Sequence, residues 1–230
     1  MIWERLQNMT NKVVAIDGPS ASGKSTVARR VADALGWLYV DSGSLYRAVA
    51  WKALKDGIDV QSSEALADLS ATTAPEFFVC EGAVRFRLDG VVLDRELRAE
   101  RINRNVSPVA ADPTVRARVT QWLHDMLLLG NLVMEGRDIG TAVFPASRHK
   151  FYLDASPEER ARRRHAEMAD VETDMSVGDV HASLNRRDTI DSRRMTAPLS
   201  VADDATIVDS TQMDIAGVVE FVVEHVKGVL

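Results

Sequence analysis

Eight consecutive residues near the N-terminus leave few folds open to this chain, because they fit the phosphate-binding pattern G-x-x-x-x-G-K-[ST]. An apolar run over residues 13–17 precedes them and a helical pattern follows, which is the strand–loop–helix setting that this pattern requires. An ordinary glycine-rich turn between a strand and a helix would need neither the lysine nor the serine after the second glycine. The stretch and the residue after it are Gly18, Pro19, Ser20, Ala21, Ser22, Gly23, Lys24, Ser25 and Thr26.

Each part of this loop has a physical role in holding a triphosphate. The glycines let successive backbone N–H groups turn toward one anion, and the N-terminus of the following helix adds partial positive charge. Lys24 can bridge the terminal phosphates, and the Ser25 hydroxyl can bind Mg²⁺. We therefore expect residues 18–26 to hold a nucleoside triphosphate together with Mg²⁺.

Length and charge narrow the class of protein. With 230 residues and 46% hydrophobic content, the chain can bury one substantial core that carries a smaller insertion or lid. The net charge of −6 argues against a general nucleic-acid or membrane-surface binder, so any phosphate site needs a local arginine cluster. There is no apolar run of about 20 residues and no signal-peptide pattern. We expect a cytoplasmic monomer.

The single cysteine and the N-terminal segment carry little functional signal. Cys80 alone excludes an internal disulfide framework and a zinc site of several thiolates. Its apolar neighbours over 77–79 favour a thiol packed in the core over a nucleophile. Residues 1–12 are interpreted as an N-terminal extension, and within it residues 1–8 are expected to be dispensable, because Met9 stands just before the first core strand.

The rest of the chain alternates strand and helix patterns. This order predicts an α/β fold with a P-loop NTPase-type parallel sheet, helices on both faces and ligands at the carboxyl ends of the strands. Ser156 is expected to cap a helix that has Pro157 at its first position. The expected helices cover 24–35, 44–56 and 113–129, one opens after Ser156, and two more cover 176–194 and begin at 214; the expected strands cover 37–41, 132–134, 150–153 and 206–208.

A stretch with a different sequence pattern interrupts this alternation of strands and helices. Residues 84–88 alternate with strand period, and Asp89-Gly90 is a hairpin signal. We interpret about 60–108 as a β-rich insert and about 156–195 as an arginine-rich helical lid. The core of the domain, residues 13–230, then comprises 13–59, 109–155 and 196–230.

Two polar clusters directly follow predicted strands. In the stretch 41–47, Ser42 or Ser44 could cap the next helix, and Arg47 could reach an anion near the same helix N-terminus. In the second cluster, Glu135 stands where a carboxylate assists Mg²⁺ in P-loop proteins, directly or through water. The residues after it, Arg137 and Asp138, could simply pair with each other on a surface turn. We favour a ligand site for both clusters.

A third cluster lies on the predicted lid helix. Arg187, Asp191 and Arg194 fall at i, i+4 and i+7, so they share one face. A solvated ladder of salt bridges is the usual explanation of this spacing. The stretch 160–194 nevertheless holds eight arginines in an acidic chain, and arginine suits the recognition of phosphoryl groups. A mobile arginine lid is the better interpretation.

Together these residues resemble bacterial cytidylate kinase, a nucleoside monophosphate kinase, over nearly the whole chain from residue 13. The resemblance rests on several specific stretches. They are the loop IDGPS over 16–20, DSG and YR over 41–47, the β-rich insert, EGRDIGT over 135–141, VFP over 143–145, the arginine-rich run over 187–194, and APL over 197–199.

The resemblance implies one cytidylate kinase domain over 13–230, in which the insert over about 60–108 binds the monophosphate, and a site for the acceptor nucleotide. In the family, a Ser and a Tyr-Arg pair contact the monophosphate nucleotide, a second Ser and an Arg contact cytosine, a Gly-Arg-Asp stretch binds phosphate and base, and the lid contacts sugar and phosphate. Ile190 departs from the pattern and is assigned no role. The matching residues are Ser42, Tyr46 and Arg47; Ser107 and Arg116; Arg137 and Asp138; and Arg187, Asp191 and Arg194.

The implied reaction is ATP + CMP ⇌ ADP + CDP, with dCMP also accepted and Mg²⁺ as cofactor. Lys24, Arg137, Arg187 and Arg194 would neutralise charge during transfer. A carboxylate such as Asp138 would favour the N4 amine of cytosine over the carbonyl of uracil. Phosphorylation of another monophosphate such as UMP, or of a small metabolite, stays open, and so does a nucleotide-dependent switch protein, although three clusters converging on a second pocket disfavour the switch.

Overall fold

The computed structural model describes residues 12–168 and 176–229. The predicted dispensable segment, residues 1–8, lies outside them. The centre of the molecule is a mixed sheet in the order β3-β4-β2-β6-β1-β7-β8, with β5 also paired to β4. The strands are β1 Val13–Asp17, β2 Leu38–Asp41, β3 Glu76–Cys80, β4 Ala83–Leu88, β5 Val91–Val92, β6 Leu132–Gly136, β7 His149–Asp154 and β8 Thr206–Asp209.

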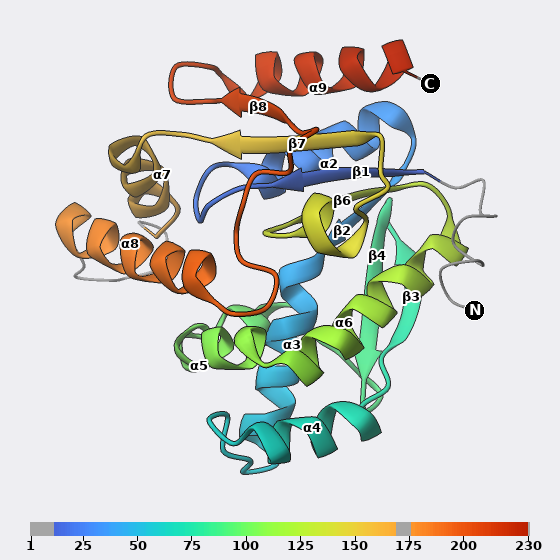
Figure 1. Ribbon diagram of the computed structural model, residues 1–230, viewed down its shortest axis with the longest axis vertical. Helices are drawn as coiled ribbons and strands as arrows, with labels where there is room; N and C mark the ends of the chain where they lie inside the picture. The colour runs from blue at the N-terminus through green and yellow to red at the C-terminus, as the bar shows by residue number, and fades with distance from the viewer. Residues whose placement is uncertain (1–11, 169–175, 230) are drawn as a thin grey trace.

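Five neighbouring strands, β2, β6, β1, β7 and β8, pair in parallel, as the alternating pattern predicts. Helices cover both faces and connect the strands (Figure 1). They are α2 Lys24–Leu35, α3 Ser42–Lys55, α4 Ser63–Thr72, α5 Glu100–Ala111, α6 Pro113–Asp125, α7 Pro157–Met168, α8 Val177–Arg193 and α9 Ile215–Val229, with short helical turns η1 Arg95–Arg98, η2 Met126–Leu129 and η3 Ile139–Val143.

Strand β1 shows how the sheet divides the core into two layers. Its residues are all buried, and successive side chains point to opposite faces because a strand has a period of two. Val13 and Ala15 pack in the cluster with α3, α5 and α6, whereas Val14 and Ile16 pack in the cluster with α2 and α9. A strand buried on both faces reads as a continuous apolar run, and that is what residues 13–16 show in the sequence.

The predicted insert contains both strands and helices. Strands β3, β4 and β5 form antiparallel pairs, and β4 joins the central sheet through the pair Tyr39 and Ala83. The same range also holds α4 and most of α5, which the sequence reading did not identify. Ile102, Val106 and Val109 are buried at helical spacing on α5, and Pro108 near its end masks that pattern.

The expectation that Cys80 is packed in the core is wrong. The thiol is exposed, and its neighbour Val79 is 48% exposed. Strand β3 is the last strand at this edge of the sheet, so part of its apolar sequence faces solvent. A local apolar run does not reveal that a strand lies at an edge.

The expectation that Ser42 or Ser44 caps α3 is also wrong. The capping residue is Asp41, whose Oδ1 accepts a hydrogen bond from the backbone N–H of Ser44 at 3.1 Å. Ser42 is the first residue of the helix and turns its hydroxyl elsewhere. At the predicted lid, in contrast, Ser156 Oγ does accept from the N–H of Glu159 at 3.2 Å, as expected for the start of α7.

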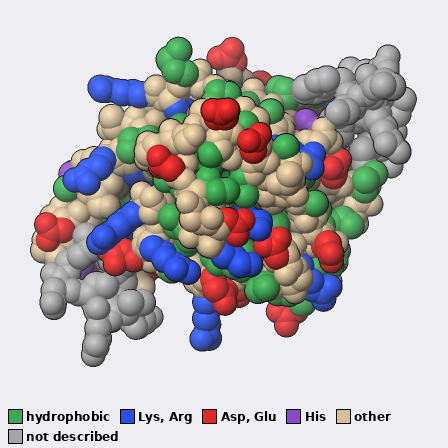
Figure 2. Space-filling view, turned by 90° about the horizontal axis from the view of Figure 1, so that it is seen from below, with side chains coloured by type: hydrophobic (Ala, Val, Ile, Leu, Met, Phe, Trp, Pro, Cys, Tyr) green, Lys and Arg blue, Asp and Glu red, His purple; other side chains and the backbone are tan. Residues whose placement is uncertain are grey.

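The carboxyl ends of β1, β2, β6 and β7 meet at one edge of the sheet, where α7 and α8 lie against each other (Figure 1). Within the described part of the chain, no helix is both long and apolar enough to cross a bilayer. On the face in Figure 2, basic and acidic side chains are interspersed, so the charge there is mixed.

Candidate active site

The segment 18–26 between β1 and the start of α2, the triphosphate loop, follows a path that requires glycine at two positions. Gly18 has a φ of 149°, and a Cβ there would lie 2.1 Å from the carbonyl oxygen of Leu153 in β7. Gly23 has a φ of 93° and is the N-cap of α2. Both positions disfavour any residue with a Cβ. The loop can therefore pass close to β7 and present the N-terminus of α2 to an anion.

Lys24 is buried at the start of α2. Its Nζ donates to the carbonyl oxygen of Pro19 at 2.5 Å and to Ser22 Oγ at 3.4 Å. Burial lowers the pKa of Lys24, and the charge of Arg137 lowers it further, while Glu135 acts in the opposite direction. A phosphate beside this ammonium would favour its charged form.

Oxygen atoms gather around Glu135, at the end of β6. Ser25 Oγ donates to Oε2 at 2.9 Å, and the hydroxyl of Tyr39 donates to Oε1 at 2.5 Å. Burial raises the pKa of Glu135, and the nearby Asp41 raises it further. A hydroxyl and a carboxylate, both hard oxygen donors, fit the coordination that Mg²⁺ prefers. The predicted metal residues Ser25 and Glu135 are thus in contact with each other.

Ser42, Tyr46 and Arg47 all lie in the first turns of α3, beside β6. Ser42 Oγ donates to the carbonyl oxygen of Glu135 at 2.7 Å. Arg47 donates to Asp41 Oδ2 at 2.9 Å, so its guanidinium stays close to the helix N-terminus. Tyr46 is buried, and within the described residues its hydroxyl has no hydrogen-bond partner.

Asp138 lies at the centre of a buried charge cluster. One carboxylate oxygen accepts from Arg116 on α6, and the other accepts from Arg194, just after α8, at 3.1 Å. The guanidinium of Arg116 stacks on the ring of Tyr46 at 5.2 Å. The alternative in which Asp138 pairs with Arg137 on a surface turn is therefore wrong. Ser107 lies on α5, one turn before the carbonyl of Ala110, which accepts from Arg116 at 2.9 Å.

Arg137 connects the lid to the triphosphate loop. Its Nε donates to Asp191 on α8 at 2.9 Å, and another of its nitrogens donates to Ser20 Oγ at 2.9 Å. Asp191 therefore pairs across to the core, and the alternative of a salt-bridge ladder along α8 is wrong. Burial lowers the pKa of Arg187 to about 10, and the positive charges of Arg137 and Arg47 act in the same direction. This gathering of guanidinium groups is suited to an anion.

Three residues that the sequence reading did not assign also contact the triphosphate loop. Asp188 accepts from the backbone N–H of Ser20 at 3.0 Å and from Arg160, whose guanidinium also donates to the carbonyl oxygen of Ser20 at 3.1 Å. Arg163 donates to the carbonyl oxygen of Ser22 at 3.3 Å. For the two arginines the only signal in the sequence is the arginine-rich composition of the lid, which does not distinguish one arginine from another, and Asp188 lies within the run 187–194 without an assigned role.

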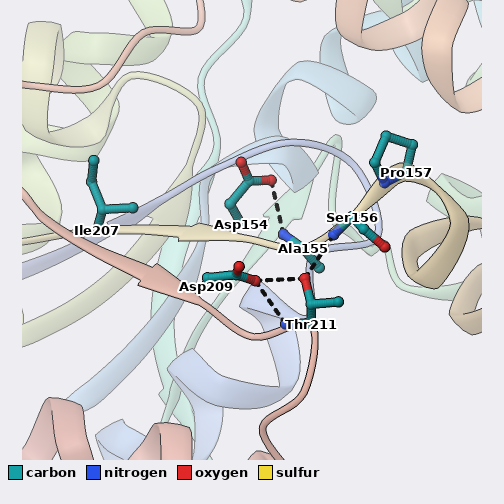
Figure 3. A pocket seen from close by; sticks show the side chains of 7 residues that line it. All are labelled: Asp154, Ala155, Ser156, Pro157, Ile207, Asp209 and Thr211. Carbon is teal, nitrogen blue, oxygen red and sulfur yellow. Dashed lines mark hydrogen bonds between the residues drawn. The ribbon is translucent and has the colours of Figure 1, made fainter.

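A cavity of about 350 Å³ opens where β7 and β8 end, close to the triphosphate loop (Figure 3). The backbone N–H of Ser156 donates to Thr211 Oγ1 at 2.9 Å across it. Ser210, in the same turn, accepts from Arg163 and donates to the carbonyl oxygen of Ser22 at 3.4 Å. The cavity lining comprises Asp154, Ala155, Ser156, Pro157, Ile207, Asp209 and Thr211.

Comparison with known proteins identifies the family of this chain. The family model described as cytidylate kinase matches residues 14–228. The chain belongs to the cytidylate kinase family. Curated cytidylate kinases from Pelotomaculum thermopropionicum, Alkaliphilus metalliredigens and Pseudomonas aeruginosa are 43%, 40% and 41% identical, over 93%, 96% and 93% of this chain and 95%, 98% and 94% of their own lengths. Membership of the cytidylate kinase family makes the chain an ATP-dependent phosphotransferase, a class that generally needs a divalent metal.

Proposed function

We propose that this chain transfers the γ-phosphoryl group of ATP to CMP and dCMP in one in-line, Mg²⁺-dependent step. The observation that carries the proposal is the adjacency of the triphosphate loop and the buried cluster around Asp138 at one edge of the sheet. The triphosphate loop carries Lys24, and the neighbouring Arg137, next to Asp138 in the chain, contacts Ser20 of that loop. Two nucleotides bound in these sites would point their phosphates at each other.

The donor nucleotide belongs in the loop. The backbone N–H groups of residues 18–26 and the charge of Lys24 would hold its phosphates, and the cavity beside Thr211 has a size suited to its base. Ser25 and Glu135 would hold Mg²⁺, directly or through water. When bound, the metal neutralises charge on the β- and γ-phosphate oxygens.

The acceptor nucleotide belongs on the other side of Arg137. Arg47, Arg137 and Arg187 would bind its phosphate, because these guanidinium groups bring positive charge to one place. Asp138, Arg116 and Ser107 would read the base, with Ser42, Tyr46, Asp191 and Arg194 completing the site. A carboxylate accepts from the N4 amine of cytosine but repels the O4 carbonyl of uracil, so this cluster favours CMP.

The chemical step needs no covalent enzyme intermediate. An oxygen of the acceptor phosphate attacks the γ-phosphorus, a new P–O bond forms, and the bond to the oxygen that bridges the β- and γ-phosphates breaks to release ADP. Lys24, Arg137, Arg187 and Arg194 neutralise the charge that spreads over the transferred group. Closure of α7 and α8 over the loop excludes water, which would otherwise accept the phosphoryl group.

A coupled assay of ADP release with CMP, dCMP, UMP and AMP tests the proposal. We expect the highest kcat/KM with CMP and dCMP. A protein that turns over another monophosphate faster, or that hydrolyses ATP without any acceptor, would contradict it. Lys24→Ala is the matched inactive variant: its turnover should fall by at least about 100-fold with an unchanged melting curve, because the removed ammonium stabilises the transferring phosphoryl group.

A further inference from the structure

Asp17, the last residue of β1, reaches across to the segment that carries Asp138. The Asp17 side chain is buried, and its two oxygens accept from the backbone N–H groups of Ile139 at 2.9 Å and Gly140 at 2.7 Å. These two N–H groups begin the helical turn η3. The first N–H groups of a helical turn have no partner within the turn, so a buried turn needs an acceptor from elsewhere.

The usual acceptor would be the side chain of the N-cap residue itself. That residue is Asp138, and aspartate is among the best N-caps. Here the Asp138 carboxylate makes no capping bond, because its two oxygens accept from Arg116 and Arg194. One carboxylate cannot both cap η3 and face the arginines. Asp17 supplies the missing cap from a strand more than 100 residues away.

We propose that Asp17 is a positioning residue that caps η3 and so leaves the carboxylate of Asp138 directed at the nucleotide base. The inference deepens the proposed function and rests on it for the identity of that base. Without the Asp17 carboxylate, the two buried N–H groups lose their acceptor, and the nearest replacement is Asp138 itself. Selectivity between bases would then fall because Asp138 turns toward its own backbone.

A second route of action for Asp17 has a different signature. Its negative charge also acts on Lys24, where it favours the charged ammonium. An effect through Lys24 would weaken the binding and use of ATP equally with every acceptor. An effect through η3 and Asp138 would weaken binding of the preferred monophosphate and leave the KM for ATP nearly unchanged.

The test compares wild type with Asp17→Asn and Asp17→Ser, which retain at most one good acceptor for the two N–H groups. For Asp17→Asn we expect the KM for the monophosphate that wild type prefers to rise about tenfold. The ratio of its kcat/KM to that of the second-best monophosphate should fall by a similar factor. The KM for ATP should change less than about twofold. Equal increases for both substrates, or an unchanged ratio, would overturn the inference.

A double-mutant cycle separates positioning from a general loss of structure. If Asp17 acts through Asp138, then adding Asp17→Asn to Asp138→Asn should narrow the base ratio little further, whereas independent effects would multiply. Asp214→Asn is the matched control, because Asp214 caps the exposed start of α9 by accepting from Gly217 at 2.8 Å and is not among the residues assigned to either nucleotide. It should leave both KM values and the base ratio unchanged.

Amide hydrogen exchange gives a readout independent of turnover. In both Asp17 variants the amides of Ile139 and Gly140 should lose protection, while the amides of β6 keep it. Retained protection at both positions would overturn the cap even if activity fell. A wild-type protein inactive with CMP would instead contradict the proposed function, and the exchange experiment and the ratio for its true acceptor would still decide the role of Asp17.

Discussion

At the scale of single residues, Asp138 links the lid, the core and the base site. Its carboxylate is buried between Arg116 from α6 and Arg194 from the end of α8. Charged donors offset the cost of burying a carboxylate, and two guanidinium groups contact this one. A change at this residue should therefore alter recognition of the base without emptying a hydrophobic core.

Asp138→Asn should reduce kcat/KM with CMP and narrow the ratio of CMP to UMP. The amide can offer an oxygen to the N4 amine of cytosine or an NH₂ group to the O4 of uracil, so the repulsion of uracil disappears. A polar base contact is worth about 1–3 kcal/mol, which corresponds to about five- to 150-fold in the ratio. The coupled assay with both nucleotides measures it. An unchanged ratio with an intact melting curve would move base recognition to Ser107 and Arg116.

Asp17 should give the stability of the protein a distinctive pH dependence. Burial raises the pKa of Asp17 from 3.8 to about 6, the charge of Asp138 adds to this, and the two backbone hydrogen bonds and Lys24 oppose it. The folded state then binds the proton of the Asp17 carboxyl more tightly than the unfolded state does. The resulting stabilisation of the folded state is full below about pH 4 and is lost as pH rises through about 6.

The measurement is the free energy of unfolding in urea from pH 4 to pH 7, for wild type and Asp17→Asn. Over this range the free energy of unfolding of wild type should fall by on the order of 3 kcal/mol relative to that of the variant. This amount corresponds to the difference between the pKa of Asp17 in the unfolded and folded states. The direction of the slope is the critical result. Parallel curves would mean that Asp17 has the same pKa in the folded and unfolded states.

At the scale of elements, the junction between α5 and α6 positions Arg116. Asp112 ends α5 and caps α6, where its Oδ1 accepts from the N–H groups of Thr114 at 2.9 Å and Val115 at 3.0 Å. Its other oxygen accepts from Ser63 at the start of α4. Arg116 follows within the first turn of α6, so its reach to Asp138 depends on where that helix begins.

Asp112→Ala should lower the free energy of unfolding by about 1–2 kcal/mol, because α6 loses its cap and Ser63 loses an acceptor. The KM for CMP should rise more than the KM for ATP, since only Arg116 is displaced. Urea denaturation and steady-state kinetics measure the two effects. Asp112→Asn, which retains a good N-cap, serves as the control and should keep most of the stability. A loss of stability with no change in the KM for CMP would show that the cap does not position Arg116.

At the scale of the whole molecule, the lid and the core are held together around the two sites. Asp188 and Asp191 on α8 accept from Ser20 and Arg137 in the core, and Ala21 of the loop packs against the small apolar cluster of α7 and α8. Nucleotides that bind at these contacts bind the folded state alone. Ligand binding should therefore be visible in global stability.

CMP at about 100 times its dissociation constant should raise the free energy of unfolding by about 2.7 kcal/mol, which is about 5–10 °C in Tm for a chain of this size. Differential scanning calorimetry without ATP measures this shift. UMP at the same concentration should stabilise less. Lys24→Ala should keep the response to CMP and lose most of the response to ATP with Mg²⁺, so an equal loss of both responses would contradict two separate sites.

Local sequence patterns identified much of this molecule. The loop motif needs only glycines, a lysine and a serine at fixed spacing, and the periodicities of α2, β6 and α8 predict their bounds to within a few residues. The polar residues that follow the strands had to meet, because parallel strands bring their carboxyl ends to one edge of the sheet. Spacing thus predicted the fold class, the loop over 18–26 and the polar clusters that follow the strands, whereas Ser107 and Arg116 were reached only through the resemblance to the family.

Only the tertiary structure decided which side chains face one another. The capping of η3 by Asp17, the two arginines around Asp138 and the contact of Asp188 with Ser20 join residues that are 22 to 168 positions apart. The exposure of Cys80 likewise depends on the place of β3 at the sheet edge. Periodicity and capping rules act over a few residues, whereas these contacts depend on strand order and helix packing, which bring distant segments together.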